Sequence, residues 1–143
     1  MMFSKTCQYS IRAIIYIAIQ SRKNIKVSIK DVSNEIDSPE YFTGKILQKL
    51  SKRNFVKSLK GPNGGFFMEK EDFELRIIDI VKEVDGDLLF TACGIGLKEC
   101  SEIKPCPIHD DYKIIKNKIQ QMLESYKIGM LVDNEDLKSI FLK

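Results

Sequence analysis

A chain of 143 residues is long enough for one compact domain, or for a small domain with a dimerisation arm. No run of about 18 uninterrupted apolar residues occurs, so we expect no membrane-spanning helix and no membrane partner. The net charge of +3 hides an asymmetry, because residues 1–70 hold 13 Lys and Arg against 5 Asp and Glu, whereas residues 71–143 hold 10 against 15. The basic half indicates a polyanionic partner, although a solvated lysine-rich surface would give the same charge balance.

The first predicted helix runs from Ser4 to about Ser21 and is apolar on nearly all sides. Such a helix has to be buried on most faces, either within the chain or against a second subunit. The segment lacks an A-x-A-like cleavage site, so its apolar residues predict a buried helix rather than a signal peptide. We therefore expect a cytoplasmic location, where clustered cysteines indicate metal or redox chemistry.

Two further helices follow in the basic half. Ser28 is suited to cap a short helix over residues 29–36, and Ser38 to cap a third helix from Pro39 to about Arg53. In the third helix one face is apolar, and the opposite face carries an exposed polar stripe at positions i, i+4, i+7 and i+11, formed by Tyr41, Lys45, Gln48 and Lys52. This order predicts a helix-turn-helix whose second helix enters the major groove, although an ordinary solvated face gives a similar stripe.

The segment after the third helix favours DNA binding over that alternative. Residues 55–59 and 65–68 are predicted to form two strands, joined by a tight Gly-Pro-Asn-Gly turn at 61–64. A basic β-wing directly after a recognition helix is placed to touch phosphates or the minor groove. The side chains that we expect to contact double-stranded DNA are Ser38, Tyr41, Thr43, Lys45, Gln48, Lys52, Lys57, Lys60 and Asn63.

In the acidic half, a short amphipathic helix over residues 75–84 precedes a loop rich in cysteine. Within seventeen residues this loop gathers three cysteines and the only histidine of the chain: Cys93, Cys100, Cys106 and His109. Thiolates select iron–sulfur clusters, zinc or copper(I), and imidazole suits most of the same metals. With two prolines and two glycines the segment cannot be one regular helix or strand, and it can fold around a metal centre.

A long helix is expected after the cysteine loop. Apolar residues recur along it at spacings of three and four, at Tyr112, Ile115, Ile119, Met122 and Tyr126. This a/d pattern is two heptads long and could pair with its copy in a homodimer. Gly129 is expected to break the helix, and Asp133 to cap a final short one. The predicted division is a winged helix-turn-helix domain (1–85), a cluster-binding loop (86–110) and a dimerisation helix with a C-terminal tail (111–143), a mainly α fold with a small β-wing.

These motifs resemble a known family. PEYFTGKILQKLSKRNFVKSLKGPNGGFF is similar to the recognition helix and wing of the IscR/NsrR-type bacterial regulators, and SKTCQYSIRAIIYIA to their first helix. The three cysteines followed by C-P-x-H match their cluster-binding loop, with a first gap one residue longer than IscR-like members usually have. Where some nitric-oxide sensors carry a ligating aspartate, this chain has Gln8 beside Cys7.

The resemblance implies a homodimeric transcription regulator that binds an iron–sulfur cluster (2Fe–2S or 4Fe–4S). We expect this regulator to be a repressor. The implied ligands are the three loop cysteines with His109 as the fourth, and operator binding would respond to redox state, nitric oxide or iron–sulfur status. Two alternatives stay open: a winged-helix regulator using the same residues as a zinc site or thiol redox switch, and a redox or adaptor protein that does not bind DNA. No P-loop, no G-x-S-x-G motif and no second histidine is present, so we do not expect an enzyme.

Overall fold

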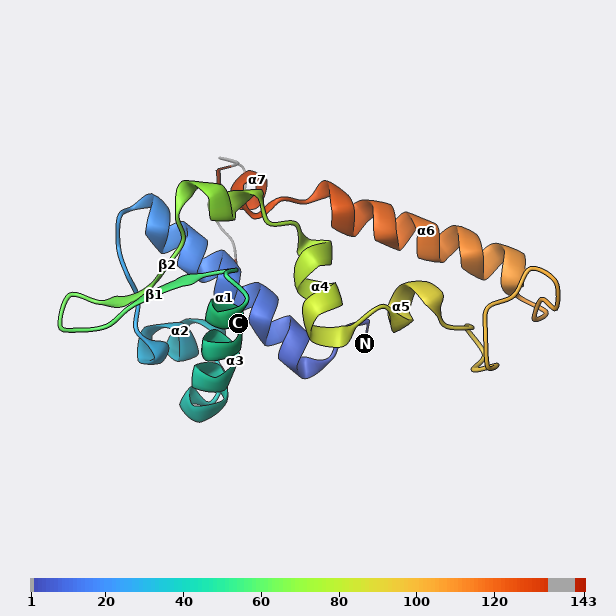
Figure 1. Cartoon of the computed structure of the whole chain (residues 1–143), viewed down its shortest axis with the longest axis horizontal. Helices are drawn as coiled ribbons and strands as arrows, with labels where there is room; N and C mark the ends of the chain where they lie inside the picture. The colour runs from blue at the N-terminus through green and yellow to red at the C-terminus, as the bar shows by residue number, and fades with distance from the viewer. Residues whose placement is uncertain (1, 134–140) are drawn as a thin grey trace.

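The computed structural model describes residues 2–133 and 141–143, which form a mostly helical fold with one two-stranded sheet. The elements in chain order are α1 (Lys5–Arg22), α2 (Ile29–Ile36), α3 (Glu40–Lys52), β1 (Lys57–Leu59), β2 (Gly65–Phe67), the 3-10 helix η1 (Lys70–Glu74), α4 (Ile77–Asp85), α5 (Leu88–Thr91), α6 (His109–Ser125) and α7 (Ile128–Asp133). In Figure 1 the hairpin lies at one end of the molecule, and the cysteine loop lies at the other, beyond α5 and α6. The predicted class, mainly α with a small β-wing, is confirmed.

Helix α1 is the centre of the core. Its N-terminus is capped by Ser4, whose hydroxyl accepts a hydrogen bond from the backbone N–H of Cys7 at 3.1 Å. Because the helix is apolar on several sides, it packs at once against α2, α3, α4, α7 and β2. Burial of Ile14 and Ile17 is complete, so the expectation of a helix buried on most faces is met within a single chain.

Helices α2 and α3 make the helix-turn-helix. A capping box between Ser28 and Asp31 starts α2, and Asp37 ends it in the left-handed backbone region at φ 52°. The prediction for the start of α3 was wrong by one position: Pro39 is the N-cap residue and makes no side-chain cap hydrogen bond. The hydroxyl of Ser38 instead pairs with that of Thr43, a contact inside the turn that the sequence pattern did not indicate.

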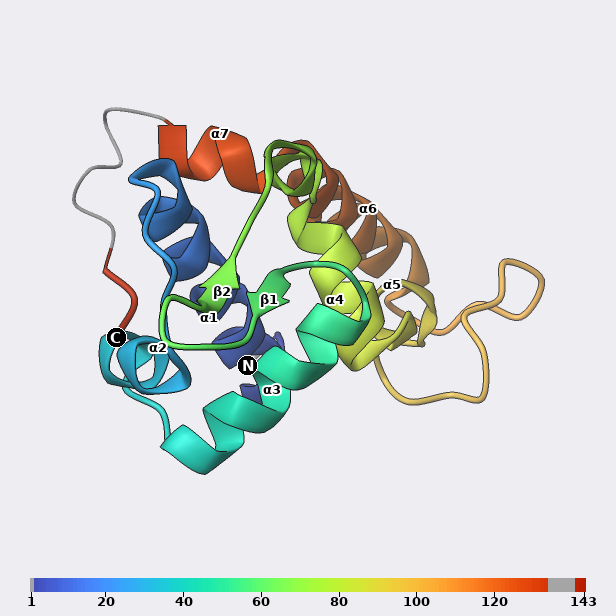
Figure 2. The same ribbon diagram turned by 60° about the vertical axis from the view of Figure 1, so that its left-hand side comes forward.

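The wing is an antiparallel hairpin in which Lys57 lies opposite Phe67, and its strands are shorter than predicted. Backbone hydrogen bonds in both directions between Val27 and Phe66, at 3.0 and 2.7 Å, attach the hairpin to the segment before α2. Figure 1 shows the hairpin projecting beyond α2 and α3, and in Figure 2 it lies in front of α1, next to both helices. Its turn needs glycine, because a Cβ atom at Gly64 would lie 2.0 Å from the carbonyl oxygen of Leu59.

Helix α6 ends earlier than expected. The predicted break at Gly129 is wrong, since α6 stops at Ser125 and Gly129 lies within α7. The cause is tertiary: the Tyr126 carbonyl accepts a hydrogen bond from the Ile77 N–H (2.9 Å), and the Ile128 N–H donates to the Leu75 carbonyl (2.8 Å). Extended backbone at this link therefore replaces helix.

Helix α7 returns to pack on α1, as Figure 1 shows. Its last residue, Asp133, accepts hydrogen bonds from two nitrogens of Arg22 at 2.8 and 2.7 Å. The final helix expected after Asp133 lies mostly outside the described residues. Within the described part of the chain, no helix is both long enough and apolar enough to span a bilayer.

Candidate DNA interface and cysteine site

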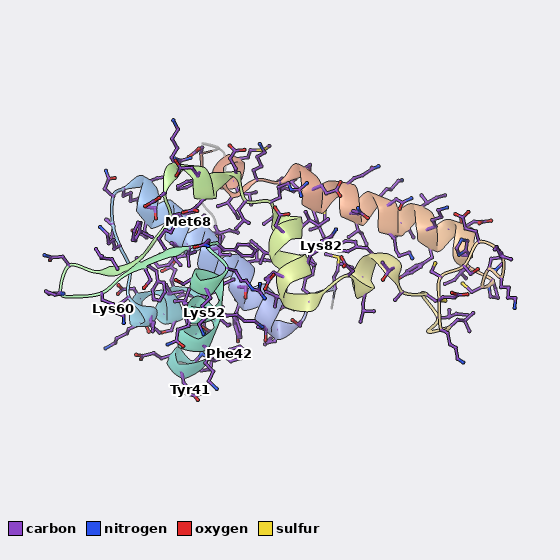
Figure 3. All side chains as sticks on the ribbon, viewed as in Figure 1. Tyr41, Phe42, Lys52, Lys60, Met68 and Lys82 are labelled. Carbon is purple, nitrogen blue, oxygen red and sulfur yellow. The ribbon has the colours of Figure 1, made fainter. Side chains whose placement is uncertain are left out.

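The predicted polar stripe of α3 lies on the surface, because Ile46, Leu47 and Leu50 on the opposite face are buried in the core. Tyr41 is 76% exposed, and the other three stripe residues are exposed as well. The ammonium of Lys45 lies 4.7 Å from the centroid of the Tyr41 ring, so the two side chains form a cation–π pair one helical turn apart. Figure 3 shows Tyr41 at the first turn of α3 and Lys52 at its other end.

A hollow of about 500 Å³ opens beside this stripe, between α2 and α3. Its lining combines the exposed face of α3 with one residue of α2: Ile29, Glu40, Tyr41, Gly44, Lys45 and Gln48. The stripe is therefore set beside a concave surface in which base edges or a methyl group can be accommodated.

Thr43 does not belong to this exposed face. It is completely buried, and its hydroxyl donates a hydrogen bond to the Pro39 carbonyl at 3.0 Å while pairing with Ser38. A buried hydroxyl that is already satisfied has no side-chain atom to offer to DNA. The expectation that Thr43 contacts DNA is therefore corrected, and Ser38 is half-buried beside it.

The two lysines of the wing differ in their surroundings. Lys60, on the wing in Figure 3, and Asn63 are exposed near the turn. Lys57 instead forms an ion pair with Asp72, at 3.0 Å from its ammonium to a carboxylate oxygen. Because the Asp72 side chain is only 9% exposed, this pair holds the hairpin against η1 and uses the charge of Lys57 within the protein.

The cysteine loop brings its predicted ligands together as two pairs. The Sγ of Cys100 lies 3.5 Å from Nδ1 of His109, and Cys106 lies close enough to Cys93 to contribute to lowering the pKa of its thiol. Cys93 and Cys106 are buried and Cys100 is half-buried. His109 is the first residue of α6, and its backbone N–H donates to the Cys106 carbonyl at 3.0 Å.

Two properties of the loop suit a metal centre. The pKa of the Cys93 thiol is lowered by hydrogen bonds from the backbone N–H groups of Ile95 and Leu97, which favours its anionic form. Nε2 of His109 is buried and, within the described residues, has no hydrogen-bond partner. In that same part of the chain no three His, Cys, Asp or Glu side chains converge at metal-binding distances. The donor set fits an iron–sulfur cluster chemically, although the side chains form two pairs rather than one closed shell.

Cys7 lies apart from this loop. It is completely buried in α1, and burial together with the nearby Asp85 raises the pKa of its thiol to about 12. A thiol that stays protonated in an apolar core behaves as a small hydrophobic residue and is a poor metal ligand.

Sequence reasoning missed two residues that shape the cysteine site. Lys116 on α6 is only 6% exposed, and its ammonium reaches the Cys100 sulfur at 3.2 Å. A Cβ at Gly94 would lie 2.9 Å from the ring of Tyr112, so the loop packs tightly on α6 at this glycine. A signal was present, since His109, Lys116 and Leu123 recur every seven residues and share the buried face of α6.

The face of α6 that carries the a/d pattern is largely open. Ile115 is 52% exposed, Met122 43% and Tyr126 44%, and Ile108 extends the same register. Tyr112 is half-buried because it packs on Gly94, so it serves the loop as well as the stripe. A helix face with this many exposed large apolar side chains indicates an interaction surface.

A helix-turn-helix with an exposed basic stripe, followed by a wing with a basic turn, defines a winged-helix DNA-binding protein. The family model of Rrf2, described as an iron-dependent transcriptional regulator, matches residues 3–134. The chain belongs to the Rrf2 family and is a DNA-binding transcriptional regulator rather than an enzyme. The resemblance to IscR/NsrR-type regulators is confirmed at the level of the family.

Three similar proteins illustrate the range of this family. A putative HTH-type transcriptional regulator of Aquifex aeolicus is 31% identical over 138 residues, covering 95% of this chain and 94% of its own. The regulator IscR of Vibrio cholerae is 25% identical over 92% of this chain and 75% of its own. The solved structure of CymR, the global cysteine regulator of B. subtilis, shares the fold with a TM-score of 0.74, at 18% identity and covering 92% and 95% of the two chains.

Proposed function

We propose that this regulator is a cytoplasmic homodimeric repressor whose operator binding is controlled by an iron–sulfur cluster. The ligands are Cys93, Cys100, Cys106 and His109. When bound, the cluster supplies one-electron chemistry and reactivity toward oxidants and nitric oxide. The observation that carries the proposal is the buried Nε2 of His109, which lacks a partner among the described residues and belongs to a side chain already in contact with a loop cysteine.

The proposed link from the loop to the DNA-binding domain runs through the end of α4, which α5 separates from the first loop cysteine. Asp85, the last residue of α4, accepts a hydrogen bond from the backbone N–H of Ser4 at 2.8 Å and pairs with the Ser4 hydroxyl. The cysteine segment begins just after Asp85, and Ser4 caps α1, which packs on both α2 and α3. A change in the loop therefore has a short route through two residues to the helix-turn-helix.

The proposed dimer uses the open face of α6. Its apolar side chains follow an a/d register, the pattern by which two helices pack knobs into holes. The α3 stripe and the wing of each protomer would then meet two half-sites that lie an integral number of helical turns apart. We assign DNA contacts to those residues predicted from the sequence that are exposed. Lys52 and Lys60 would contact phosphates, and Tyr41, Lys45 and Gln48 would contact base edges.

A second candidate is a thiol switch with no metal. The lowered pKa of the Cys93 thiol and its contact with Cys106 favour a pair that peroxide could oxidise. The two thiols would lose two electrons and two protons to form a disulfide, and one hydrogen peroxide would become two waters.

Anaerobic purification separates these functions. The cluster proposal predicts a brown protein with visible charge-transfer absorption and with iron and acid-labile sulfide in equal amounts. A colourless protein containing about one zinc per chain would overturn it in favour of a zinc site. A colourless, metal-free protein that forms a Cys93–Cys106 disulfide with peroxide would favour the thiol switch.

A further inference from the structure

Lys116 is the one lysine on the buried face of α6 within the described residues. An ammonium removed from water at 6% exposure is costly unless the protein replaces its lost hydration. The side chain cannot reach solvent freely here, so the groups that contact its ammonium must replace the lost water.

Three groups surround the Lys116 ammonium. It donates hydrogen bonds to the carbonyl oxygen of Ala92 at 3.1 Å and to the sulfur of Cys100 at 3.2 Å, and it lies 5.2 Å from the centroid of the Tyr112 ring. Within the described parts of the chain, no ion pair with an Asp or Glu is found for this lysine. Of these three groups, the Cys100 sulfur is the one that would carry a negative charge as a metal ligand.

The same three contacts join the beginning and middle of the cysteine loop to one turn of α6. Ala92 directly precedes Cys93. The sulfur of Cys100, which Lys116 contacts, also lies beside the imidazole of His109. Tyr112 packs on Gly94 so closely that a Cβ there would be 2.9 Å away. Lys116 is thus placed where the loop, the proposed ligands and the dimer helix meet.

We infer that Lys116 is a positioning residue of the cysteine site. Its ammonium holds the Cys100 sulfur against α6 and places a fixed positive charge beside it. The effect of this charge on a cluster rests on the proposed function. Beside a bound cluster, an N–H donor and a positive charge at a ligating sulfur stabilise the more negative reduced state and raise the reduction potential.

The test compares Lys116→Met, which keeps the length of the side chain without charge, with Lys116→Arg, which keeps the charge. Lys118→Met is the matched control, since Lys118 is exposed on the same helix. After anaerobic reconstitution, the potential should shift to a more negative value in Lys116→Met, return most of the way in Lys116→Arg, and stay at the wild-type value in the control. Equal potentials in wild type and Lys116→Met, at equal iron content, would overturn the inference.

Hydrogen exchange of metal-free protein tests the contact independently of any cluster. Loss of the tether should raise exchange at least several-fold across residues 92–106 in Lys116→Met while α1 stays protected. Unchanged exchange in this loop would overturn the tether. If wild-type protein binds no iron, the proposed function fails, and the comparison of reduction potentials can no longer be made. The hydrogen-exchange result alone then decides whether Lys116 holds the loop.

Discussion

The DNA-binding surface and the cysteine site differ in what holds their side chains in place. On α3 the reading face is fixed from behind, because Ile46, Leu47 and Leu50 anchor the helix in the core of the domain. Between Ala92 and Ile108 the chain forms turns and bends without helix or strand, and its links to α6 are a few polar contacts and the packing of Gly94 on Tyr112. The DNA-binding surface is therefore formed by the folding of the domain itself, whereas the proposed ligand set would be completed only by the group that it binds.

That difference suits a sensor. A recognition helix that is preformed loses little entropy on meeting DNA, so its affinity can be altered through small displacements of the whole domain. In the proposed function, a ligand set that is not yet closed would gain much of its order from the metal, so loss of the metal would change the local structure. The Asp85–Ser4 hydrogen bond joins the end of α4, which precedes the cysteine segment, to the N-terminal cap of α1.

The largest effect is expected from the loop cysteines. Changing Cys93, Cys100 or Cys106 singly to alanine should remove a ligand and abolish visible absorption and bound iron. Cys7→Ala is the matched control, because the Cys7 thiol is buried in α1 with its pKa raised to about 12. Iron assays on the four variants check this, and loss of iron from Cys7→Ala would point to a ligand from the first helix.

The dimer contact is next in size. Ile115→Asp places a charge in the a/d stripe of α6 and should weaken dimerisation by about 3 kcal/mol, or roughly a hundredfold, as for a central interface residue. Ile114→Asp is the control, since Ile114 is 54% exposed but lies outside the stripe. Sedimentation should show monomers only for Ile115→Asp, and equal behaviour of the two variants would argue against this interface.

Base preference should depend on the α3 stripe. Gln48→Ala should relax discrimination at one base pair by about 1–3 kcal/mol, the usual range for a direct base contact. Thr43→Ser is informative beside it, because the buried Thr43 hydroxyl serves the turn and not the groove. Selection of binding sites from random DNA measures both; a changed sequence preference for Thr43→Ser and none for Gln48→Ala would reverse the assignment.

The two wing lysines should separate charge used for DNA from charge used for folding. Lys60→Met should weaken binding to all sequences and lower the slope of log affinity against log salt by about one unit. Lys57→Met should change the slope less and cost about 1 kcal/mol of unfolding free energy, because it leaves Asp72 without its partner. A salt titration and a urea titration on each variant distinguish the roles, and identical profiles would contradict them.

The smallest effect concerns Asp79 at the start of α4. Burial alone would raise the pKa of its carboxyl, but hydrogen bonds from the side chain and backbone of Arg76 outweigh burial and hold it below the usual value. A folded-state pKa below the unfolded one stabilises the protein above the unfolded pKa, and this stability is lost as pH falls through the folded value. Asp79→Asn should therefore lower the unfolding free energy by under about 1 kcal/mol at pH 7, and the gap should close below about pH 4. A gap that stays constant with pH would exclude this ion pair as its cause.

Local patterns were sufficient for much of the fold. The apolar register of α1, the cap of α2 and the stripe of α3 depend on neighbours within a few residues, so their positions follow from spacing. The errors came from contacts distant in sequence. The end of α6 is set by backbone hydrogen bonds to Leu75 and to Ile77, the first residue of α4. Lys57 likewise pairs with a residue fifteen positions later, while its predicted contact with DNA stays a prediction.

The cysteine site shows the same limit more strongly. Spacing and donor chemistry single out three cysteines and His109, because few other functions need such a cluster of residues. The sequence does not predict a role for Lys116, because a lysine in a helix is normally solvated, and only the packing of the loop on α6 buries it. Thr43 was misjudged for a related reason, since its position on α3 is turned toward the helix-turn-helix interior.

The central claim is that cluster state controls DNA binding. Fluorescence anisotropy under anaerobic conditions, with duplex obtained by site selection, should compare the loaded protein with the same sample after chelation, at one salt concentration. The account predicts at least a tenfold difference in Kd between the two forms, lost in Cys100→Ala. Equal affinities for loaded and stripped wild-type protein, with iron content verified in each, would contradict it.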